Sequence, residues 1–245
     1  MRGDILKKKL MVLCAVAIMI STCLTGCKMN SGKIRFGSAG IGGTYQIFGD
    51  TFANLISSKS KKYNIEVKTT AGSAANLRLL SKDYIQMAVA QMDLINDAYN
   101  RTGIFENDKK YQGYRAVASL YTEACQIVVP ADSDIQSMDD LEGKKVCIGE
   151  EESGTEQNAL QILNAYGLNE RLVDTVNLNY TDAAKKLKSG DIDAFFCTAG
   201  VQTTVINELS KQCKIRLVSL DQKGVSRLKK SYKFYTEYTI PAGRS

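Results

Sequence analysis

From residue 33 onward, hydrophobic positions alternate between the two-residue spacing of strands and the three-to-four-residue spacing of helices. Glycine and small polar residues mark most changes from one pattern to the other. The strands predicted in the first part of the chain are Lys33–Gly37, Asn64–Thr69, Met87–Ala90 and Tyr114–Tyr121. The helices predicted there are Thr44–Ser58, Ser73–Ser81 and Asp93–Asn100.

The alternation continues in a second series from residue 123. Gly167 follows the first helix of this series and is its expected stop, because glycine readily takes the left-handed conformation that ends a helix. The strands predicted are Glu123–Val129, Lys145–Ile148, Val173–Leu178, Ala194–Thr198 and Lys214–Ser219. The helices predicted are Gly154–Tyr166, Thr181–Ser189 and Val201–Ser210.

Strands and helices that alternate at this spacing predict an α/β fold built from parallel units with right-handed crossovers. Turn-rich stretches at residues 101–113 and 130–143 divide the series into two lobes. We place lobe one at residues 33–120 and lobe two at residues 121–238, each a mostly parallel sheet flanked by helices.

The first 27 residues have the three parts of an export signal. Lys7–Lys9 is a positive region, Leu10–Ile20 is an apolar region too short for a permanent membrane span, and small residues follow. Leu24-Thr25-Gly26-Cys27 resembles the bacterial lipobox. We therefore expect a signal peptide at residues 1–26, cleavage before Cys27, lipidation of Cys27, and a lipidated tether at residues 27–32. The alternative is an uncleaved anchor with an incidental cysteine.

Charge and composition narrow the function classes. The formal net charge is +6, but residues 1–26 carry about half of it, and acidic and basic residues are interspersed in the remainder. That pattern does not indicate nucleic-acid binding, which needs a basic stripe. The chain has no histidine, which excludes Ser-His-Asp and Cys-His catalysis and any histidine-ligated metal.

Four cysteines follow Cys27, and none of them belongs to a CxxC pair. Each lies in or beside an apolar run, which is typical of small buried hydrophobic residues. An exported location also permits disulfides, and the sequence does not choose among the possible pairings. These residues are Cys125, Cys147, Cys197 and Cys213.

Five small, polar turns follow predicted strands, at the edge where parallel α/β sheets bind ligands. Glycines there let the backbone approach a ligand, and the free N–H groups of a helix start attract an anion. Together they predict a cleft that holds something small and anionic with hydroxyls and backbone amides. The turns are Gly40–Tyr45, Thr69–Ser73, Ala90–Asp93, Glu152–Glu156 and Thr198–Gly200.

Each turn also has a simpler interpretation. Gly40–Tyr45 fits a plain glycine turn or a dinucleotide loop, although it lacks a P-loop lysine. Ser153 with Glu156 fits a helix capping box. Carboxylates such as Glu150 have no obvious acid–base partner, which favours a binding protein over an enzyme. We predict no catalytic residue, no metal site and no cofactor.

Six motifs, in order, resemble the TAXI family, the solute-receptor subunits of tripartite ATP-independent periplasmic (TRAP) transporters. The resemblance runs from about Lys33 to Gly243. The motifs are Gly42-Gly-Thr-Tyr45, Ala71-Gly-Ser73-Ala-Ala-Asn-Leu-Arg78, Val89-Ala-Gln-Met-Asp93, Ser153-Gly-Thr-Glu156, Gly190-Asp-Ile-Asp-Ala-Phe-Phe196 and Thr239-Ile-Pro-Ala-Gly243.

The resemblance implies a two-lobed, type II periplasmic-binding-protein fold that closes on glutamate, glutamine or a dicarboxylate. The partners it implies are this solute, a TRAP membrane permease and, through Cys27, the outer face of a membrane. Amide and hydroxyl groups would hold a carboxylate, and Asp93 is a candidate partner for an amino group. The ligand contacts it implies are Gly43, Thr44, Tyr45, Ser73, Asn76, Gln91, Asp93, Ser153, Gly154, Thr155, Thr198, Ala199 and Gly200.

Two departures from the family pattern affect this interpretation. Gln46 stands where the family often has a second aromatic or bulky residue. Family members also continue beyond the Ile-Pro-Ala-Gly segment, so residues 239–245 would begin a return crossover whose remainder, part of lobe one, is missing. A ligand-binding sensor partner of a signalling protein and a non-functional truncated receptor therefore remain alternatives.

Overall fold

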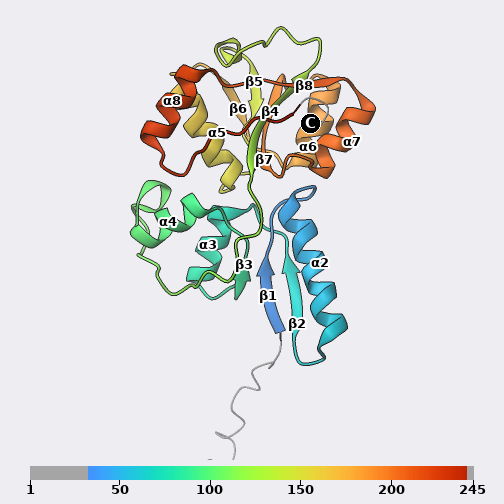
Figure 1. Ribbon diagram of the computed structural model, residues 1–245, viewed down its shortest axis with the longest axis vertical. Helices are drawn as coiled ribbons and strands as arrows, with labels where there is room; N and C mark the ends of the chain where they lie inside the picture. The colour runs from blue at the N-terminus through green and yellow to red at the C-terminus, as the bar shows by residue number, and fades with distance from the viewer. Residues whose placement is uncertain (1–32, 242–245) are drawn as a thin grey trace, which may run out of the picture. The chain divides into compact units, whose positions relative to one another are not determined.

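The strands of the chain form two separate sheets in the computed structural model, which describes residues 33–241 (Figure 1). The expected signal peptide, Cys27 with its tether, and residues 242–245 of the expected crossover lie outside the described residues. Within them, no helix is long and apolar enough to cross a membrane.

The first sheet has the order β2-β1-β3, with β1 and β3 parallel. We call this sheet and its helices the N-terminal half. Its elements are β1 (Lys33–Gly37), α2 (Thr44–Lys59), β2 (Asn64–Lys68), α3 (Ser73–Ser81), β3 (Met87–Ala88), α4 (Met92–Asn100) and the short η1 (Gly103–Phe105).

Two hydrophobic groups hold the N-terminal half together. Phe48 and Phe52 lie one turn apart on α2 and stack with ring centroids 5.9 Å apart, and both contact Phe36 of β1. Leu77 of α3 and Leu94 of α4 belong to a second cluster. The predicted helical stripe of α2 is therefore the face that packs on the sheet.

The second sheet has the order β6-β5-β7-β4-β8, and we call it and its helices the C-terminal half. Helices α5 and α8 cover one face and α6 and α7 the other (Figure 1). Its elements are β4 (Ala124–Pro130), η2 (Asp139–Leu141), β5 (Lys145–Cys147), α5 (Gly154–Ala165), β6 (Asp174–Val176), α6 (Tyr180–Ser189), β7 (Ala194–Ala199), α7 (Thr204–Gln212), β8 (Ile215–Leu217) and α8 (Gln222–Ser231).

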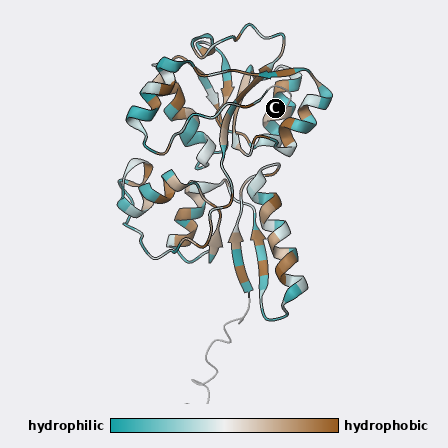
Figure 2. Cartoon of the chain, viewed as in Figure 1, coloured by the Kyte–Doolittle hydropathy of each residue, from teal (hydrophilic) through white to brown (hydrophobic). Residues whose placement is uncertain are grey.

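Strand β7 carries the core of the C-terminal half on both faces. Every residue of β7 is buried, and successive side chains enter opposite clusters, Phe195 with α6 and α7, Phe196 with α5 and α8. A strand covered on both sides is expected to be apolar throughout. Figure 2 shows that the surrounding helices carry both hydrophobic and hydrophilic residues, as helices with one buried face do.

Strand β4 departs from the predicted parallel arrangement, because it runs antiparallel to both β7 and β8. The chain passes from β4 to β5 without an α-helix, through a connection that contains only η2. The usual crossover between parallel strands contains an α-helix, and this connection has none. Strands β5, β6 and β7 are parallel, as predicted, because α5 and α6 connect them.

The prediction of a strand at Tyr114–Tyr121 is wrong. These residues have no strand hydrogen bonds and are largely exposed, with Val117 84% exposed. Their alternating pattern alone does not form a strand, since no described strand pairs with them. Helix α8 was not predicted. Asp221 is its N-cap residue, and the Asp221 carboxylate accepts a hydrogen bond from Gly224 N at 2.6 Å. The expected lobe boundary at residues 120 and 121 stays a prediction.

Truncation of Phe196 should strongly destabilise the protein. The side chain is fully buried in the α5-side cluster, so Phe196→Ala should lower the free energy of unfolding by about 3–5 kcal/mol. Urea denaturation followed by circular dichroism measures this change. Val117→Ala, at an exposed position, is the control and should change stability by less than about 0.5 kcal/mol. Equal effects at the two positions would contradict the two-sided core.

Candidate ligand-binding site

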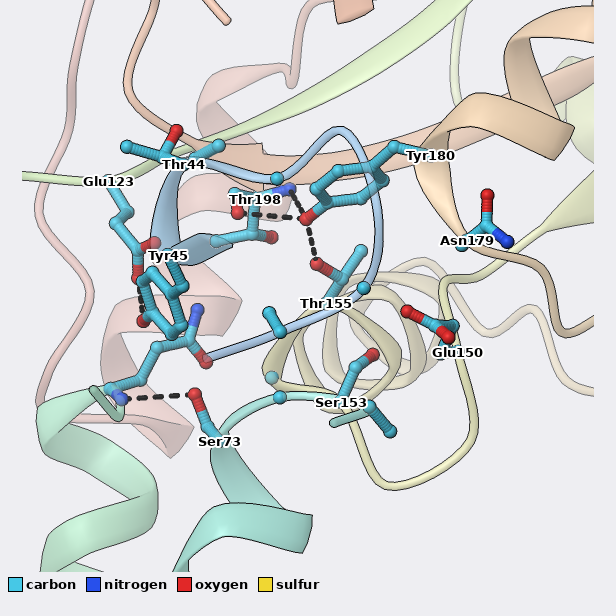
Figure 3. Close-up of a pocket in the computed structure, with 18 of the residues that line it drawn as sticks. Thr44, Tyr45, Ser73, Glu123, Glu150, Ser153, Thr155, Asn179, Tyr180 and Thr198 are labelled. Carbon is cyan, nitrogen blue, oxygen red and sulfur yellow. Dashed lines mark hydrogen bonds between the residues drawn. The ribbon is translucent and has the colours of Figure 1, made fainter. Parts of the chain in front are cut away.

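One pocket lies where the strand ends of both halves meet the starts of the helices (Figure 3). Its volume is about 40 Å³, so its occupant must be small. The position agrees with the general rule for α/β sheets, in which ligands bind beyond the carboxyl ends of the strands. The lining residues are Ala39, Gly40, Gly43, Thr44, Tyr45, Ala71, Gly72, Ser73, Gln91, Tyr121, Glu123, Glu150, Ser153, Gly154, Thr155, Leu178, Asn179, Tyr180, Thr198 and Ala199.

Most of the ligand contacts expected from the sequence line this single pocket. They come from all five of the polar turns, which the fold brings together although they span more than 150 residues of sequence. The expected contacts that line it are Gly43, Thr44, Tyr45, Ser73, Gln91, Ser153, Gly154, Thr155, Thr198 and Ala199.

Three expected contacts lie outside the lining and have structural partners instead. The Asn76 amide donates to Ser38 O at 2.7 Å and Val89 O at 2.9 Å, which fastens the ends of β1 and β3. Asp93 Oδ1 accepts from Leu94 N at 2.8 Å within the first turn of α4, and Gly200 O accepts from Gln126 Nε2 at 3.5 Å. Their polar groups serve local structure.

The N-cap residues of five helices, α2 to α6, all line the pocket. Each helix N-terminus carries a partial positive charge of about half an elementary charge. In α2, α3 and α4 the N-cap residues Gly43, Gly72 and Gln91 make no side-chain capping bond. Some first-turn N–H groups already have acceptors, such as Ala75 N with Glu152 O and Leu94 N with Asp93 Oδ1, and the remaining ones suit a carboxylate.

Gly72 is a position that requires glycine. Its backbone has φ of 132° and ψ of −143°, a region that side chains with a Cβ essentially do not enter. A Cβ at this position would make only ordinary contact with Ser153 in the opposite half, so the backbone conformation is what requires glycine. Glycine here allows α3 to begin at the pocket.

The expected capping box at Ser153 is half formed. Ser153 Oγ accepts from Glu156 N at 3.0 Å, while the Glu156 carboxylate accepts from Glu152 N at 2.8 Å and not from the N–H of Ser153. The hydroxyl hydrogen of Ser153 is still free to donate into the pocket. Capping and ligand binding are thus compatible at this residue.

Glu123 lines the pocket but was not expected from the sequence. Each of its carboxylate oxygens accepts a hydrogen bond from a tyrosine hydroxyl. Tyr45 OH donates to its Oε2 at 3.0 Å (Figure 3). Tyr121 OH donates to its Oε1 at 3.4 Å. Burial raises the pKa of Glu123 to about 7, an effect that the hydroxyl donors counter only in part. No local pattern indicated this residue, because Glu123 occupies the start of a predicted strand.

Glu150 supplies a second carboxylate, on the opposite side of the pocket in Figure 3. A Cβ on Gly40 would collide with this carboxylate, so the glycine allows Glu150 to lie against the first turn. Burial, and then the neighbouring Asp182, raise the pKa of Glu150.

Among the described residues, no lysine or arginine lines the pocket. The expectation of a purely anion-binding cleft is therefore incomplete, because the pocket presents both signs of charge. Two unit charges 4 Å apart interact by about 4 kcal/mol at an effective dielectric constant of about 20. One helix N-terminus contributes about 0.3–1 kcal/mol to an anion. The charge of a ligand group beside Glu123 therefore contributes more to the interaction free energy than any single helix N-terminus does.

Tyr180, also missed by the sequence, fixes the end of β7. Its hydroxyl donates to Thr198 O at 2.9 Å, accepts from Thr198 N at 3.2 Å and bonds to Thr155 Oγ1 (Figure 3). Thr198 is 9% exposed, and its Oγ1 has no hydrogen-bond partner within residues 33–241. The residue opposite on β4 is Cys125, whose thiol is only a weak donor. Thr198 therefore lines the pocket and carries a buried hydroxyl without a hydrogen-bond partner.

Direct polar contacts join the halves around the pocket. The Arg78 guanidinium lies 3.0 Å from Glu152 Oε1, and Ala75 N donates to Glu152 O at 3.1 Å. Gln91 Nε2 donates to Asn158 Oδ1 at 3.0 Å. This ion pair is half-buried, and even a fully exposed pair contributes up to about 1 kcal/mol.

The remaining expectations about chemistry concern cysteines and metals. Cys125, Cys147, Cys197 and Cys213 are all free thiols. Cys125 and Cys197 point to opposite faces of the second sheet, because Gln126, next to Cys125, is the residue paired with Cys197. Within residues 33–241, no group of three or more acidic, cysteine or histidine side chains could hold a metal ion.

Comparison with solved structures identifies the fold. The alkanesulfonate-binding protein SsuA from Xanthomonas axonopodis pv. citri, bound to MOPS, is similar with a TM-score of 0.52 and 18% identity, over 77% of this chain and 60% of that one. The binding protein of a phosphonate ABC transporter from Pseudomonas aeruginosa has a TM-score of 0.53 and 13% identity, over 86% and 76%. The substrate-binding protein of an amino acid ABC transporter has a TM-score of 0.50 and 20% identity, over 79% and 80%.

This chain thus spans about three fifths of the length of SsuA. At these identities the likeness shows the fold, that of the type II periplasmic solute-binding proteins. The model of the NMT1-like family matches residues 36–245, which include every strand except the first three residues of β1 and every residue of the pocket. The chain therefore belongs to the NMT1-like family.

Proposed function

We propose that this protein is an extracytoplasmic receptor that captures a small solute for a membrane transporter and catalyses no reaction. The observation that carries the proposal is the pocket itself, which five helix N-termini from both halves surround. A carboxylate held there would contact both halves at once. Its binding energy would then favour the closed arrangement over an open one, as in hinged binding proteins.

We further propose that the transporter is of the TRAP type and that the solute is glutamate, glutamine or a dicarboxylate. The support is the order of the TAXI-like motifs, together with the convergence of most of them on the pocket. In a TRAP system the permease uses an ion gradient, so the receptor has to deliver a loaded, closed form and no ATP is consumed.

Lipidation of Cys27 would hold the receptor at the outer membrane surface. Each buried CH₂ of a lipid chain contributes about 0.8 kcal/mol, so two or more chains anchor a protein firmly. Residues 28–32 would then serve as the tether.

The solute itself should stabilise the receptor. A ligand at about one hundred times its Kd adds about 2.7 kcal/mol of stability, which raises the melting temperature of a protein of this size by about 5–10 °C. Differential scanning fluorimetry with amino acids and dicarboxylates measures this shift. Proteoliposomes with the cognate permease should then take up the same solute only with the receptor and an ion gradient. A flat response across the whole solute set would contradict the receptor function.

Removal of the Thr198 hydroxyl should weaken binding without loss of stability. Thr198→Val keeps the shape and removes an oxygen that has no protein partner, so the free energy of unfolding should stay equal or rise slightly. Affinity for the solute should fall about tenfold, the loss of one hydrogen bond to a charged group. Isothermal titration calorimetry measures the affinity. Thr204→Val, at an exposed position outside the pocket, is the matched control.

Cys27→Ser should abolish lipidation. The variant lacks the thiol that accepts the lipid, so cells fed an alkynyl palmitate should label the wild-type protein and not the variant. The variant should also keep its signal peptide, which mass spectrometry detects. Labelling that persists in the variant would favour the uncleaved anchor.

A further inference from the structure

The pocket has a charge pattern that selects among the solutes proposed above. Glu123 and Glu150 lie on opposite sides of it, and no basic side chain among the described residues joins them in the lining. A solute with a carboxylate at each end would place at least one of them beside a glutamate. A dicarboxylate therefore fits the charges poorly.

Glu123 has the geometry of a built binding group. Its two oxygens are oriented by separate donors, Tyr45 OH from α2 and Tyr121 OH from the connecting segment. Each oxygen keeps a further lone pair for another donor. A partly buried carboxylate without a cation is costly, and a cation brought by the solute would offset that cost.

The complementary anion site lies in the same pocket. Helices α2, α3 and α4 begin beside its lining residues Gly43, Gly72 and Gln91, which make no side-chain capping bond, and Thr198, whose Oγ1 has no hydrogen-bond partner, also lines it. Thr198 is buried enough that water does not readily replace a ligand there. The pocket thus provides for a carboxylate and an ammonium group together, the two groups of an α-amino acid.

We infer that Glu123 is the subsite for the ammonium group of the solute, and that the receptor takes amino acids with neutral or basic side chains in preference to glutamate and dicarboxylates. This inference rests on the receptor function proposed above and deepens it. The second carboxylate, Glu150, excludes an acidic side chain from the far side of the pocket.

The titration of Glu123 predicts how the affinity for the solute depends on pH. Its pKa of about 7 in the empty pocket means that an ammonium group must bind the deprotonated form. Affinity should therefore rise about tenfold from pH 6 to pH 8, as the competent fraction grows. Besides its tyrosine neighbours, Glu123 faces Asp93 of α4 and the thiols Cys125 and Cys197 of β4 and β7. Burial raises the pKa of both thiols, which stay neutral over this range.

Calorimetric titration of the purified full chain with L-glutamine, L-arginine, L-glutamate and succinate tests the inference. At pH 8, glutamine or arginine should bind at least about tenfold more tightly than glutamate, and succinate should not bind measurably. Glu123→Gln should weaken amino acid binding by about thirtyfold or more and remove the pH dependence. Glu170→Gln, an exposed residue outside the lining, makes the same charge change and should alter neither.

Two further variants keep the test decisive. Asp93→Asn should leave the pH dependence in place, which assigns it to Glu123. Glu123→Asp retains the charge and should restore part of the affinity even if the glutamine variant folds poorly. Succinate or glutamate binding as tightly as glutamine, or an unaffected Glu123→Gln, would overturn the inference and leave the receptor function intact. Failure of every probe and of a wider solute library would overturn both.

Discussion

The constraint on which this structure depends is the direction of the βα unit. In a parallel unit the helix starts where the strand ends, so every strand carboxyl end and every helix N-terminus lies at one edge of its sheet. The βα units of both halves follow this rule, with β4 as the antiparallel exception, and their edges meet at the pocket. The N-caps of α2 to α6 converge there as a consequence of the topology. No individual residue has to arrange them.

The rest of the site depends on residues that hold this edge in place. Asn76 fastens the ends of β1 and β3, and Tyr180 fastens the end of β7 through both backbone groups of Thr198. Both side chains use polar atoms that would otherwise be available to a ligand. Rigid strand ends of this kind leave the unpaired groups, such as Thr198 Oγ1, in fixed positions.

In the proposed receptor, the balance of charges in the pocket would determine which solutes bind. Helix N-termini favour an anion in general, whereas a carboxylate at a defined position distinguishes between solutes of similar size. Glu123 lies in the segment that joins the two halves, and its hydroxyl partner Tyr45 belongs to α2. A group bound to Glu123 would therefore contact the connection between the halves as well as the pocket.

The sequence by itself determined the alternation of strands and helices and the turns that line the pocket. Periodicity and glycine placement are local properties, and α3 begins and ends at the residues predicted. Only the tertiary structure decided which partners a segment has. It reversed β4 against β7, left residues 114–121 without a strand to pair with, and engaged Asn76 and Asp93 in local hydrogen bonds outside the pocket lining. It also brought Glu123 beside Tyr45, 78 residues earlier in the chain. Charge and burial at a site arise from such distant contacts, which no local pattern encodes.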